Sequence, residues 1–500
     1  MFRILQFEII RHNFFQAQKF NFINDLDYSS GPYTTMLIGP NGTGKSQLLE
    51  LLIKIFNIII SSQEQGQKIQ NFDFDFELTY RIENNLAQIR CVRGKDVYKV
   101  NNEDCNLNDL PTPAKILASA INLNDRFPFY TSRSKAKNTK YEYLGIRTAS
   151  NNAFKNYNTL IDRFSYSLVN EENIEKYRKI FDQIGLKPEI TITYKAGKNL
   201  TLNKLSNGQN YSNDPLLLAE KFQSIIEKLD RPGRFSIRKD RYQKVISHPE
   251  NLQLIVNFLV NKIDLQIPRK GLIKYNSHTK FDNLQEVHYF RDEAQSLQLL
   301  RELELLDVDK LILHRKEGSY GFDQASSGEY HILSSFINII STIKPNSLVL
   351  IDEPEISLHP NWQIQYMSLL QKTFTKYSNC HFIISTHSHF LVSDLEPEKS
   401  AIISFHSDNN GRIFNETLEY ETTGWSAENV LYRVFGVSTV RNYYLEMDLR
   451  DLLSKISNGS KDFKHMNEIL DRLKKFDLTI DDPLTQIIQT AEGYLDNHGN

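Results

Sequence analysis

The pattern of hydrophobic and polar positions at the start of the chain predicts several strands and one long helix. Some runs are dense in β-branched and aromatic residues, and others alternate apolar with polar side chains, as a half-buried strand does. Strands are expected over residues 2–10, 20–22, 34–38, 72–80, 89–92 and 116–123. Residues 45–60 differ, because their leucines and isoleucines have helical spacing. The Asn84–Asn85 turn between two of the strands predicts an antiparallel meander.

The pattern changes twice in the rest of the chain, which predicts four regions. Helical spacing without a phosphate-binding motif is found over 216–229, 252–263 and 293–306. Strands then return at 311–313, 348–351 and 382–385, and further helices are expected at 329–343, 447–456 and 463–476. The regions are the first half of an α/β unit (1–130), a helical insertion lobe (131–304), the second half of the unit (305–440) and a helical tail (441–500).

Composition and charge restrict the class of protein. The chain has 500 residues, of which 40% are hydrophobic and 24% charged, so we expect globular domains rather than disorder. Because the net charge is -2, any contact with nucleic acid has to use a local basic patch. Three cysteines are too few for a disulfide framework. The longest apolar run, 48–60, is interrupted by polar residues, and no secretory signal is found, so a soluble cytoplasmic protein without a membrane partner is expected.

A glycine-rich loop between the strand 34–38 and the helix 45–60 matches the phosphate-loop pattern G-x-x-x-x-G-K-[ST]. Glycines are needed there because the backbone has to curl around phosphates with its N–H groups pointing inward. Lys45 is predicted to contact the β- and γ-phosphates of ATP, and the Ser46 hydroxyl to bind Mg²⁺. The predicted nucleotide-binding residues are Gly39, Pro40, Asn41, Gly42, Thr43, Gly44, Lys45 and Ser46. An unrelated glycine turn is the alternative, but the strand–loop–helix context favours ATP.

Two carboxylates end the apolar strand 348–351. A strand that is apolar on both faces belongs in the middle of a parallel sheet, and its carboxyl end then lies beside the phosphate loop. Asp352 is therefore predicted to orient the Mg²⁺ shell, and Glu353 to act as the general base that polarises the attacking water. Two solvated acids at a strand end are the alternative, which the presence of the phosphate loop disfavours.

Two further elements carry polar groups suited to a γ-phosphate. Ser326, Ser327 and Gly328 open the helix 329–343, and the N-terminus of a helix is an anion site. A simple serine N-cap is the alternative for this motif. His387 follows the strand 382–385, and its imidazole is predicted to hydrogen-bond the γ-phosphate as part of the catalytic site. A lone histidine at such a place is otherwise structural.

The order of these motifs resembles ABC-type ATPase heads over residues 1–125 and 305–400. The phosphate loop, Ser-Ser-Gly-Glu, Leu-Ile-Asp-Glu-Pro-Glu, Ser-Leu-His-Pro and Ser-Thr-His follow one another. The Asp-Glu-Pro-Glu run is similar to the branch that contains Rad50, SMC, RecF and the overcoming-lysogenization-defect nucleases. This resemblance implies a parallel core sheet with an antiparallel meander, and a head-to-head homodimer, or a higher homo-oligomer, with two ATP molecules at the interface. Residues 326–328 would then face the nucleotide of the other protomer, and 357–360 would cross the interface.

Two of the family's nucleotide contacts are left open by the sequence. The family has a glutamine after the strand that follows the meander, whereas this chain offers only Asn122 and Asn124 there. The aromatic residue that stacks on adenine is not assigned, and the candidates are Phe14, Phe15 and Phe20.

Two basic stretches lie in the insertion lobe. The first is interleaved with tyrosines and contains Arg133, Lys135, Lys137, Lys140, Arg147 and Lys155. The second contains Arg231, Arg234, Arg238, Lys239, Arg241 and Lys244. About six to ten such charges on one face suffice to bind a phosphate backbone. A solvated loop, or a patch for an acidic partner protein, is the alternative, so nucleic-acid binding through the lobe stays open.

Together these features predict an ATP hydrolase that regulates a separate effector. The lobe has no sustained heptad for a long coiled-coil arm, and neither a Toprim signature nor an H-N-H constellation is found, so a nuclease has to be another chain. Among short-insertion ATPases, the chain is most similar to the ATPase subunit of Septu-type bacterial anti-phage systems, including retron-linked forms, which is paired with a separate HNH nuclease. A RecF-like repair or recombination ATPase that binds DNA directly as a clamp is the alternative.

Overall fold

The computed structural model divides the chain into two compact units, Met1–Gly424 and Trp425–Asn500. The described residues are 1–23, 31–66, 72–122, 124–129, 139–147, 153–168, 170–196, 220, 223–224, 247–262, 274–303, 305–393, 395–408, 411–418, 443–460, 462–474 and 483–498. The predicted helix 216–229 therefore lies almost wholly outside the described residues, and the second basic stretch lies entirely outside them. Among the helices that are described, none has the length and apolarity that a membrane span requires.

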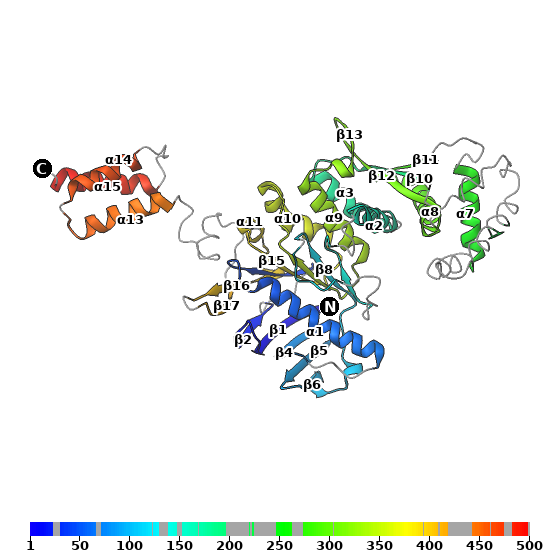
Figure 1. The fold of residues 1–500 in the computed structure, drawn as a ribbon, viewed down its shortest axis with the longest axis horizontal. Coiled ribbons are helices and arrows are strands. Elements are labelled where there is room, and N and C mark those ends of the chain that lie inside the picture. The colour runs from blue at the N-terminus through cyan, green and yellow to red at the C-terminus, as the bar shows by residue number, and fades with distance from the viewer. Residues whose placement is uncertain are drawn as a thin grey trace. The chain divides into compact units, whose positions relative to one another are not determined.

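A seven-stranded sheet forms the centre of the first unit (Figure 1). Its strand order is β17-β16-β3-β15-β14-β8-β9, and all neighbouring pairs are parallel except β16 with β17. The strands are β3 (Tyr33–Ile38), β8 (Ile116–Ala120), β9 (Tyr141–Tyr143), β14 (Leu348–Asp352), β15 (His381–Thr386), β16 (Ser400–Ser407) and β17 (Ile413–Leu418). Because β3, β14 and β15 are parallel neighbours that are buried along their whole length, their carboxyl ends meet at one edge in the middle of the sheet.

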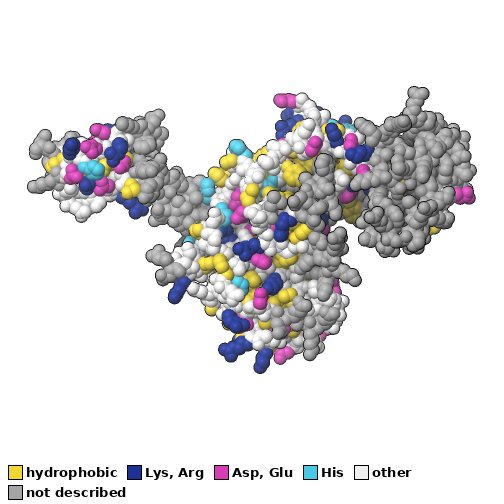
Figure 2. Space-filling view, in the orientation of Figure 1, with side chains coloured by type: hydrophobic (Ala, Val, Ile, Leu, Met, Phe, Trp, Pro, Cys, Tyr) yellow, Lys and Arg dark blue, Asp and Glu magenta, His cyan; other side chains and the backbone are white. Residues whose placement is uncertain are grey.

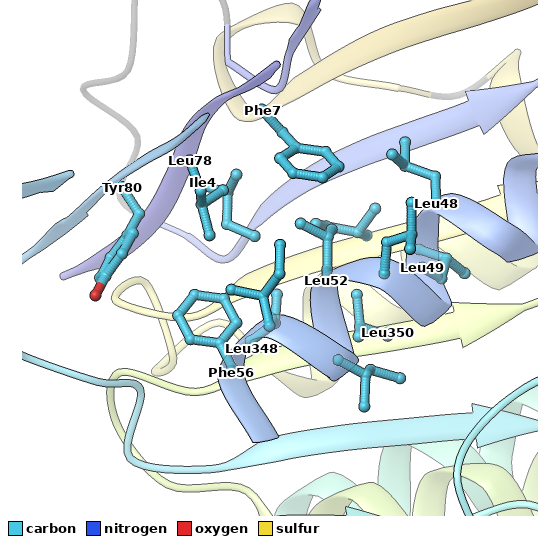
Figure 3. Packing of buried hydrophobic residues seen from close by; sticks show 14 of the residues in the cluster. Ile4, Phe7, Leu48, Leu49, Leu52, Phe56, Leu78, Tyr80, Leu348 and Leu350 are labelled. Carbon is cyan, nitrogen blue, oxygen red and sulfur yellow. The ribbon is translucent and has the colours of Figure 1, made fainter. Parts of the chain in front are cut away.

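A six-stranded antiparallel sheet forms a second layer, and helix α1 (Lys45–Gln65) packs against both sheets. Its order is β2-β1-β4-β5-β6-β7, with β1 (Phe2–Arg11), β2 (Gln18–Asn21), β4 (Asp75–Ile82), β5 (Asn85–Val92), β6 (Lys95–Val100) and β7 (Glu103–Asp104). Figure 3 shows this core, where Leu48, Leu52 and Phe56 of α1 lie among Ile4, Phe7, Leu78, Tyr80, Leu348 and Leu350. Full burial of one such side chain stabilises the fold by roughly 1.5–3 kcal/mol, so this layer holds the meander firmly on α1.

The described part of the insertion lobe contains strands as well as helices, and two of its strands form a sheet apart from β9. Its described helices are α2 (Ala153–Ser167), α3 (Glu171–Gln183), α7 (Pro249–Lys262) and α8 (Leu284–Glu302). The predicted helices 252–263 and 293–306 correspond to α7 and α8, although α8 begins earlier and ends before β12, whereas α2 and α3 are not predicted. Strands β10 (Glu189–Ala196) and β11 (Lys274–Lys280) join β12 (Leu306–Arg315) and β13 (Gly318–Gly321) in a sheet of order β11-β10-β12-β13. The hydrophobic pattern does not predict β11, because its sequence KYNSHTK is mostly polar. The lobe therefore shares a sheet with the second half of the α/β unit.

The chain runs from this shared sheet directly into helix α9 (Ser327–Thr342), and α9 packs against α2 of the lobe. Helix α10 (Pro360–Thr373) follows β14, and the short helix α11 (His389–Val392) follows β15. The predicted α/β class, with a parallel core sheet, an antiparallel meander and an insertion, is confirmed. Because α9 packs on α2 of the lobe and follows the shared sheet along the chain after the short turn Phe322–Gln324, a displacement of the lobe would reach the start of α9.

The second unit is a bundle of helices. It contains α13 (Tyr443–Ser457), α14 (Phe463–Leu473) and α15 (Pro483–His498). Their buried contacts form a separate core of Leu452, Met466, Ile469, Leu470, Leu473, Ile488, Ala491 and Leu495. The two predicted terminal helices correspond to α13 and α14, and α15 is an addition that the sequence pattern does not predict.

Candidate nucleotide-binding site

The phosphate loop lies between β3 and α1 and depends on glycine at two close approaches. Gly39 and Gly44 have φ angles of 140° and 92°, a region that other residues rarely adopt. A Cβ on Gly44 would lie 2.6 Å from the ring of Phe14, and one on Gly39 would clash with the carbonyl oxygen of Phe405 in β16. The loop is therefore pressed against two aromatic residues, and only glycine fits there.

Lys45 is held inside the curl of this loop. Its side chain is buried, and Nζ donates hydrogen bonds to the carbonyl oxygens of Gly39 at 2.8 Å and Pro40 at 3.0 Å. The Thr43 hydroxyl donates to the same Pro40 oxygen at 2.8 Å. Burial lowers the pKa of Lys45 to about 8, although nearby carboxylates, Glu353 first among them, oppose the shift. A buried ammonium group with no carboxylate in direct contact is suited to an incoming anion.

Ser46 and Asp352 meet directly, although they are far apart in the sequence. The Ser46 hydroxyl donates to Asp352 Oδ1 at 2.8 Å, and the Ser385 hydroxyl donates to the same oxygen. Burial raises the pKa of Asp352, and the two hydroxyl groups oppose this rise. A carboxylate and a hydroxyl are the hard oxygen ligands that Mg²⁺ prefers, with phosphate oxygens and water completing the shell. In the described part of the chain no cluster of three His, Cys, Asp or Glu residues could hold a metal alone, so a metal here would share its coordination with the nucleotide.

Glu353 projects from the carboxyl end of β14 in an unusual backbone conformation. Its φ of 50° is positive, and its amide donates to the carbonyl oxygen of Ser385 at 3.0 Å. The carboxylate Oε1 lies 3.5 Å from Nε2 of His387, which directly follows the neighbouring strand β15. The hydrogen bond with His387 lowers the pKa of Glu353 below its ordinary value, so the carboxylate is ionised and able to accept a proton.

Ser326 caps helix α9, Ser327 after it is exposed, and Gly328 is buried. The Ser326 hydroxyl accepts the Glu329 amide at 3.3 Å, and the Glu329 carboxylate accepts the Ser326 amide at 2.8 Å, which is a capping box. Ser326 and Ser327 are exposed, whereas a Cβ on Gly328 would lie 2.6 Å from the Trp362 ring and 3.0 Å from the Ser357 carbonyl oxygen. Within the described residues, Ser326–Gly328 make no hydrogen bond to the phosphate loop of the same chain.

The buried Glu329 and His331 and the half-buried Glu355 are polar residues of this site that the sequence did not assign. The carboxylate of Glu329 also binds Arg315 and Tyr320. Burial by itself raises the pKa of Glu329, but the Ser326 amide and these two partners outweigh burial, so the pKa is lowered from its ordinary value. Glu355 lies in the segment between β14 and α10 and accepts the His387 amide, while His331 of α9 contacts the same segment at the Ile356 carbonyl oxygen. The Ser-x-x-Glu pattern predicts the capping box of Glu329, whereas no sequence pattern predicts the contacts of Glu355 and His331.

The structure separates some of the candidates for the two nucleotide contacts that the sequence left open, the residue after β8 and the aromatic residue that stacks on adenine. Asn122 and Asn124 are exposed and bond to each other, while the buried Asp125 beside them is bound by Tyr143 and Arg147. Phe15 and Phe20 are buried, but Phe14 is 42% exposed beside Gly44.

The first basic stretch is only partly described. Lys140 donates to the Thr112 hydroxyl at 2.8 Å, and Arg147 pairs with Asp125, so these two cations are engaged within the chain. Residues 133–137 lie outside the described residues, and the side chain of Lys155 is likewise not described. On the face in Figure 2, basic and acidic side chains are interspersed over the described part of the molecule, in keeping with the net charge of -2.

Comparison with known proteins gives a family and several distant relatives. A family model described as "AAA ATPase domain" matches residues 12–392. The chain is 22% identical over 405 residues to the "Retron Vc95 probable ATPase" of Vibrio cholerae serotype O1 biovar El Tor, covering 75% of this chain and 70% of that protein. It is 23% identical over 436 residues to the "Retron Ec83 probable ATPase" of Escherichia coli, covering 81% and 72%.

A shorter match and a solved structure complete the comparison. The "Septu protein PtuA" of Bacillus thuringiensis is 25% identical over 157 residues, which is 28% of this chain and 38% of that protein. The SMC head domain from Thermotoga maritima superposes with a TM-score of 0.37 at 12% identity, covering 84% of this chain and 100% of that chain. The relatives confirm the predicted resemblance to the ATPases of retron and Septu systems.

Proposed function

Because the chain belongs to the AAA ATPase domain family, we propose that its phosphate-loop site binds ATP with Mg²⁺ and hydrolyses the γ-phosphate. The observation that carries this proposal is the juxtaposition of two pairs at the carboxyl ends of the adjacent parallel strands β3, β15 and β14. Ser46 and Asp352 form one pair, and Glu353 and His387 form the other. The proposal is tested by ATPase assays on the purified chain and on the Glu353 and Lys45 variants described in the Discussion.

Each residue has a distinct role in this proposal. The loop amides and Lys45 bind the phosphates, while Ser46 and Asp352 hold the metal, which neutralises charge on the β- and γ-phosphates when bound. The ionised Glu353 accepts a proton from the attacking water. The imidazole of His387 donates a hydrogen bond to a γ-phosphate oxygen, and its contact with Glu353 keeps the two groups together.

We further propose that the active form is a head-to-head homodimer. The exposed hydroxyls of Ser326 and Ser327 are available to a nucleotide on another protomer, and Gly328 seats this helix end against Ser357. Segment 357–360 would then cross the interface. The dimer is tested by light scattering with and without ATP.

Phe14 is proposed to stack on the adenine base, so Phe14→Ala is expected to weaken ATP binding. Stacking of one base on an aromatic ring is worth about 1–3 kcal/mol, which predicts roughly a tenfold increase in the Kd for ATP. Isothermal titration calorimetry measures this change. Phe414, an exposed phenylalanine of β17 that is 49% exposed, offers a matched control in Phe414→Ala, which should bind ATP like the unchanged protein. Equal Kd values for both variants would remove Phe14 from the site.

ATP binding is expected to take up a proton in alkaline solution. Burial lowers the pKa of Lys45 to about 8, so its ammonium form is lost as the pH rises through that value. Phosphate charges would raise this pKa again, so affinity should fall up to about tenfold for each pH unit above 8. Calorimetry in two buffers of different ionisation enthalpy should detect uptake approaching about one proton near pH 9 and little near pH 7. The same proton count at both pH values would contradict the role of Lys45.

The effector of this ATPase is proposed to be a separate nuclease chain in an anti-phage system. The names of the retron and Septu relatives support a defence role, and the Septu resemblance suggests the nuclease partner. Affinity purification from the native host, followed by mass spectrometry, tests this proposal. A nuclease encoded by a neighbouring reading frame should co-purify. Recovery with repair or replication proteins, together with direct DNA binding, would favour the RecF-like alternative.

A further inference from the structure

Glu355 lies two residues after Glu353, and its carboxylate is bound to the backbone of His387. Oε1 accepts the His387 amide at 2.6 Å. Oε2 is buried and has no hydrogen-bond partner among the described residues. Burial raises the pKa of Glu355, and the bond from the His387 amide opposes that rise. The half-buried Glu355 side chain, whose Oε1 accepts the His387 amide, is therefore fixed at the junction between β15 and α11.

The same segment is held from its other side by α9. His331 Nδ1 lies 2.6 Å from the carbonyl oxygen of Ile356, the residue after Glu355. Burial lowers the pKa of His331 to about 4, so its ring is neutral near pH 7, and Nδ1 must carry the hydrogen because a carbonyl oxygen only accepts. Gly328 adds a close backbone approach to Ser357. The segment 355–357 thus joins the start of α9 to the His387 peptide.

We propose that Glu355 is a positioning residue for ATP hydrolysis. By binding the amide of His387, its carboxylate fixes the peptide from which the imidazole projects, and that imidazole lies 3.5 Å from the Glu353 carboxylate. Without this bond the peptide could rotate, and His387 would leave both Glu353 and the γ-phosphate. Because His331 connects the same segment to α9, a displacement of α9 is transmitted to His387 through Glu355. This inference rests on the proposed ATP hydrolysis.

The test compares Glu355→Ala with Glu355→Gln. Alanine removes the acceptor, so kcat should fall at least about tenfold, whereas the Kd for ATP should change less than about twofold because no phosphate contact is lost. Glutamine keeps an acceptor oxygen for the His387 amide and should retain at least about half of the kcat. Thermal unfolding and ATP titration of each variant establish that the site is folded. Wild-type kcat in Glu355→Ala would overturn the proposal, as would equal losses in the two variants.

A control variant and a double mutant separate positioning from general loosening of the segment. Gln363 Nε2 donates to the carbonyl oxygens of Glu355 at 3.5 Å and Leu358 at 3.0 Å, and its Oε1 accepts from the Ser388 hydroxyl at 2.6 Å. It therefore joins the backbone of this segment to α11 without touching the Glu355 carboxylate or His387. Gln363→Leu should lower kcat less than about threefold. A loss as large as that of Glu355→Ala would overturn the proposal.

A double mutant that combines Glu355→Ala with His387→Ala measures whether Glu355 acts through His387. If Glu355 acts through His387, adding Glu355→Ala to His387→Ala should lower kcat by less than about twofold more. Additive losses would overturn the proposal. These outcomes differ from a failure of the proposed function itself. If the protein were not an ATPase, the unchanged protein would show no ATPase activity that Glu353→Gln could remove.

Discussion

Glu353→Gln is expected to lower the kcat for ATP hydrolysis by about 10²–10⁴-fold, the usual contribution of a general base, while ATP still binds. The contact with His387 lowers the pKa of the Glu353 carboxylate and so keeps it ionised, in the form that can accept a proton, whereas an amide cannot accept one. Phosphate contacts through Lys45 remain in the variant. Because hydrolysis no longer ends the bound state, the variant with ATP should elute as a dimer. Single-turnover hydrolysis, ATP titration and light scattering measure the three consequences.

Glu317→Gln is the matched control for this substitution. Glu317 is an exposed glutamate in the turn between β12 and β13, and the same change there should leave both kcat and ATP affinity unaltered. Normal turnover by purified Glu353→Gln, free of contaminating ATPase, would exclude Glu353 as the base. Loss of ATP binding in the variant would instead point to a structural role for this carboxylate.

The central residues of the site could be predicted because each motif is contiguous and ends a strand. Ser46 and Asp352 are 306 positions apart, yet their 2.8 Å contact follows from two facts visible in the sequence. A glycine loop follows one apolar strand, and a carboxylate pair follows another. In a parallel sheet such ends meet at one edge. The structure places β15 between β3 and β14, which also brings His387 beside Glu353.

Contacts that depend on tertiary pairing could not be predicted in this way. Strand β11 is polar along much of its length and exists because it pairs with β10, which in turn pairs with β12. The sequence does not distinguish the three phenylalanines proposed to stack on adenine, because they are the same residue type. The structure separates them by burial, since Phe14 is exposed whereas Phe15 and Phe20 are buried. Arg147 belongs to a basic stretch in the sequence, but the buried Asp125 engages it in the folded chain. Charge patterns alone do not reveal such pairing.

Lys45→Ala is expected to weaken ATP binding at least about 10²-fold, and hydrolysis at ordinary ATP concentrations should be lost with it. The ammonium group is buried, and its hydrogen-bond acceptors among the described residues are the carbonyl oxygens of Gly39 and Pro40, so phosphate oxygens can replace those acceptors with a gain in charge complementarity. Lys54→Ala is the control on the same helix, because Lys54 makes an exposed ion pair with Asp73 at 2.7 Å, which is worth only about 0–1 kcal/mol. Titration with fluorescent ATP should give an unchanged Kd for Lys54→Ala and no measurable binding for Lys45→Ala. If Lys45→Ala bound ATP as tightly as Lys54→Ala, the curl of the loop around Lys45 would be a structural feature, and the phosphate-binding role would have to be abandoned.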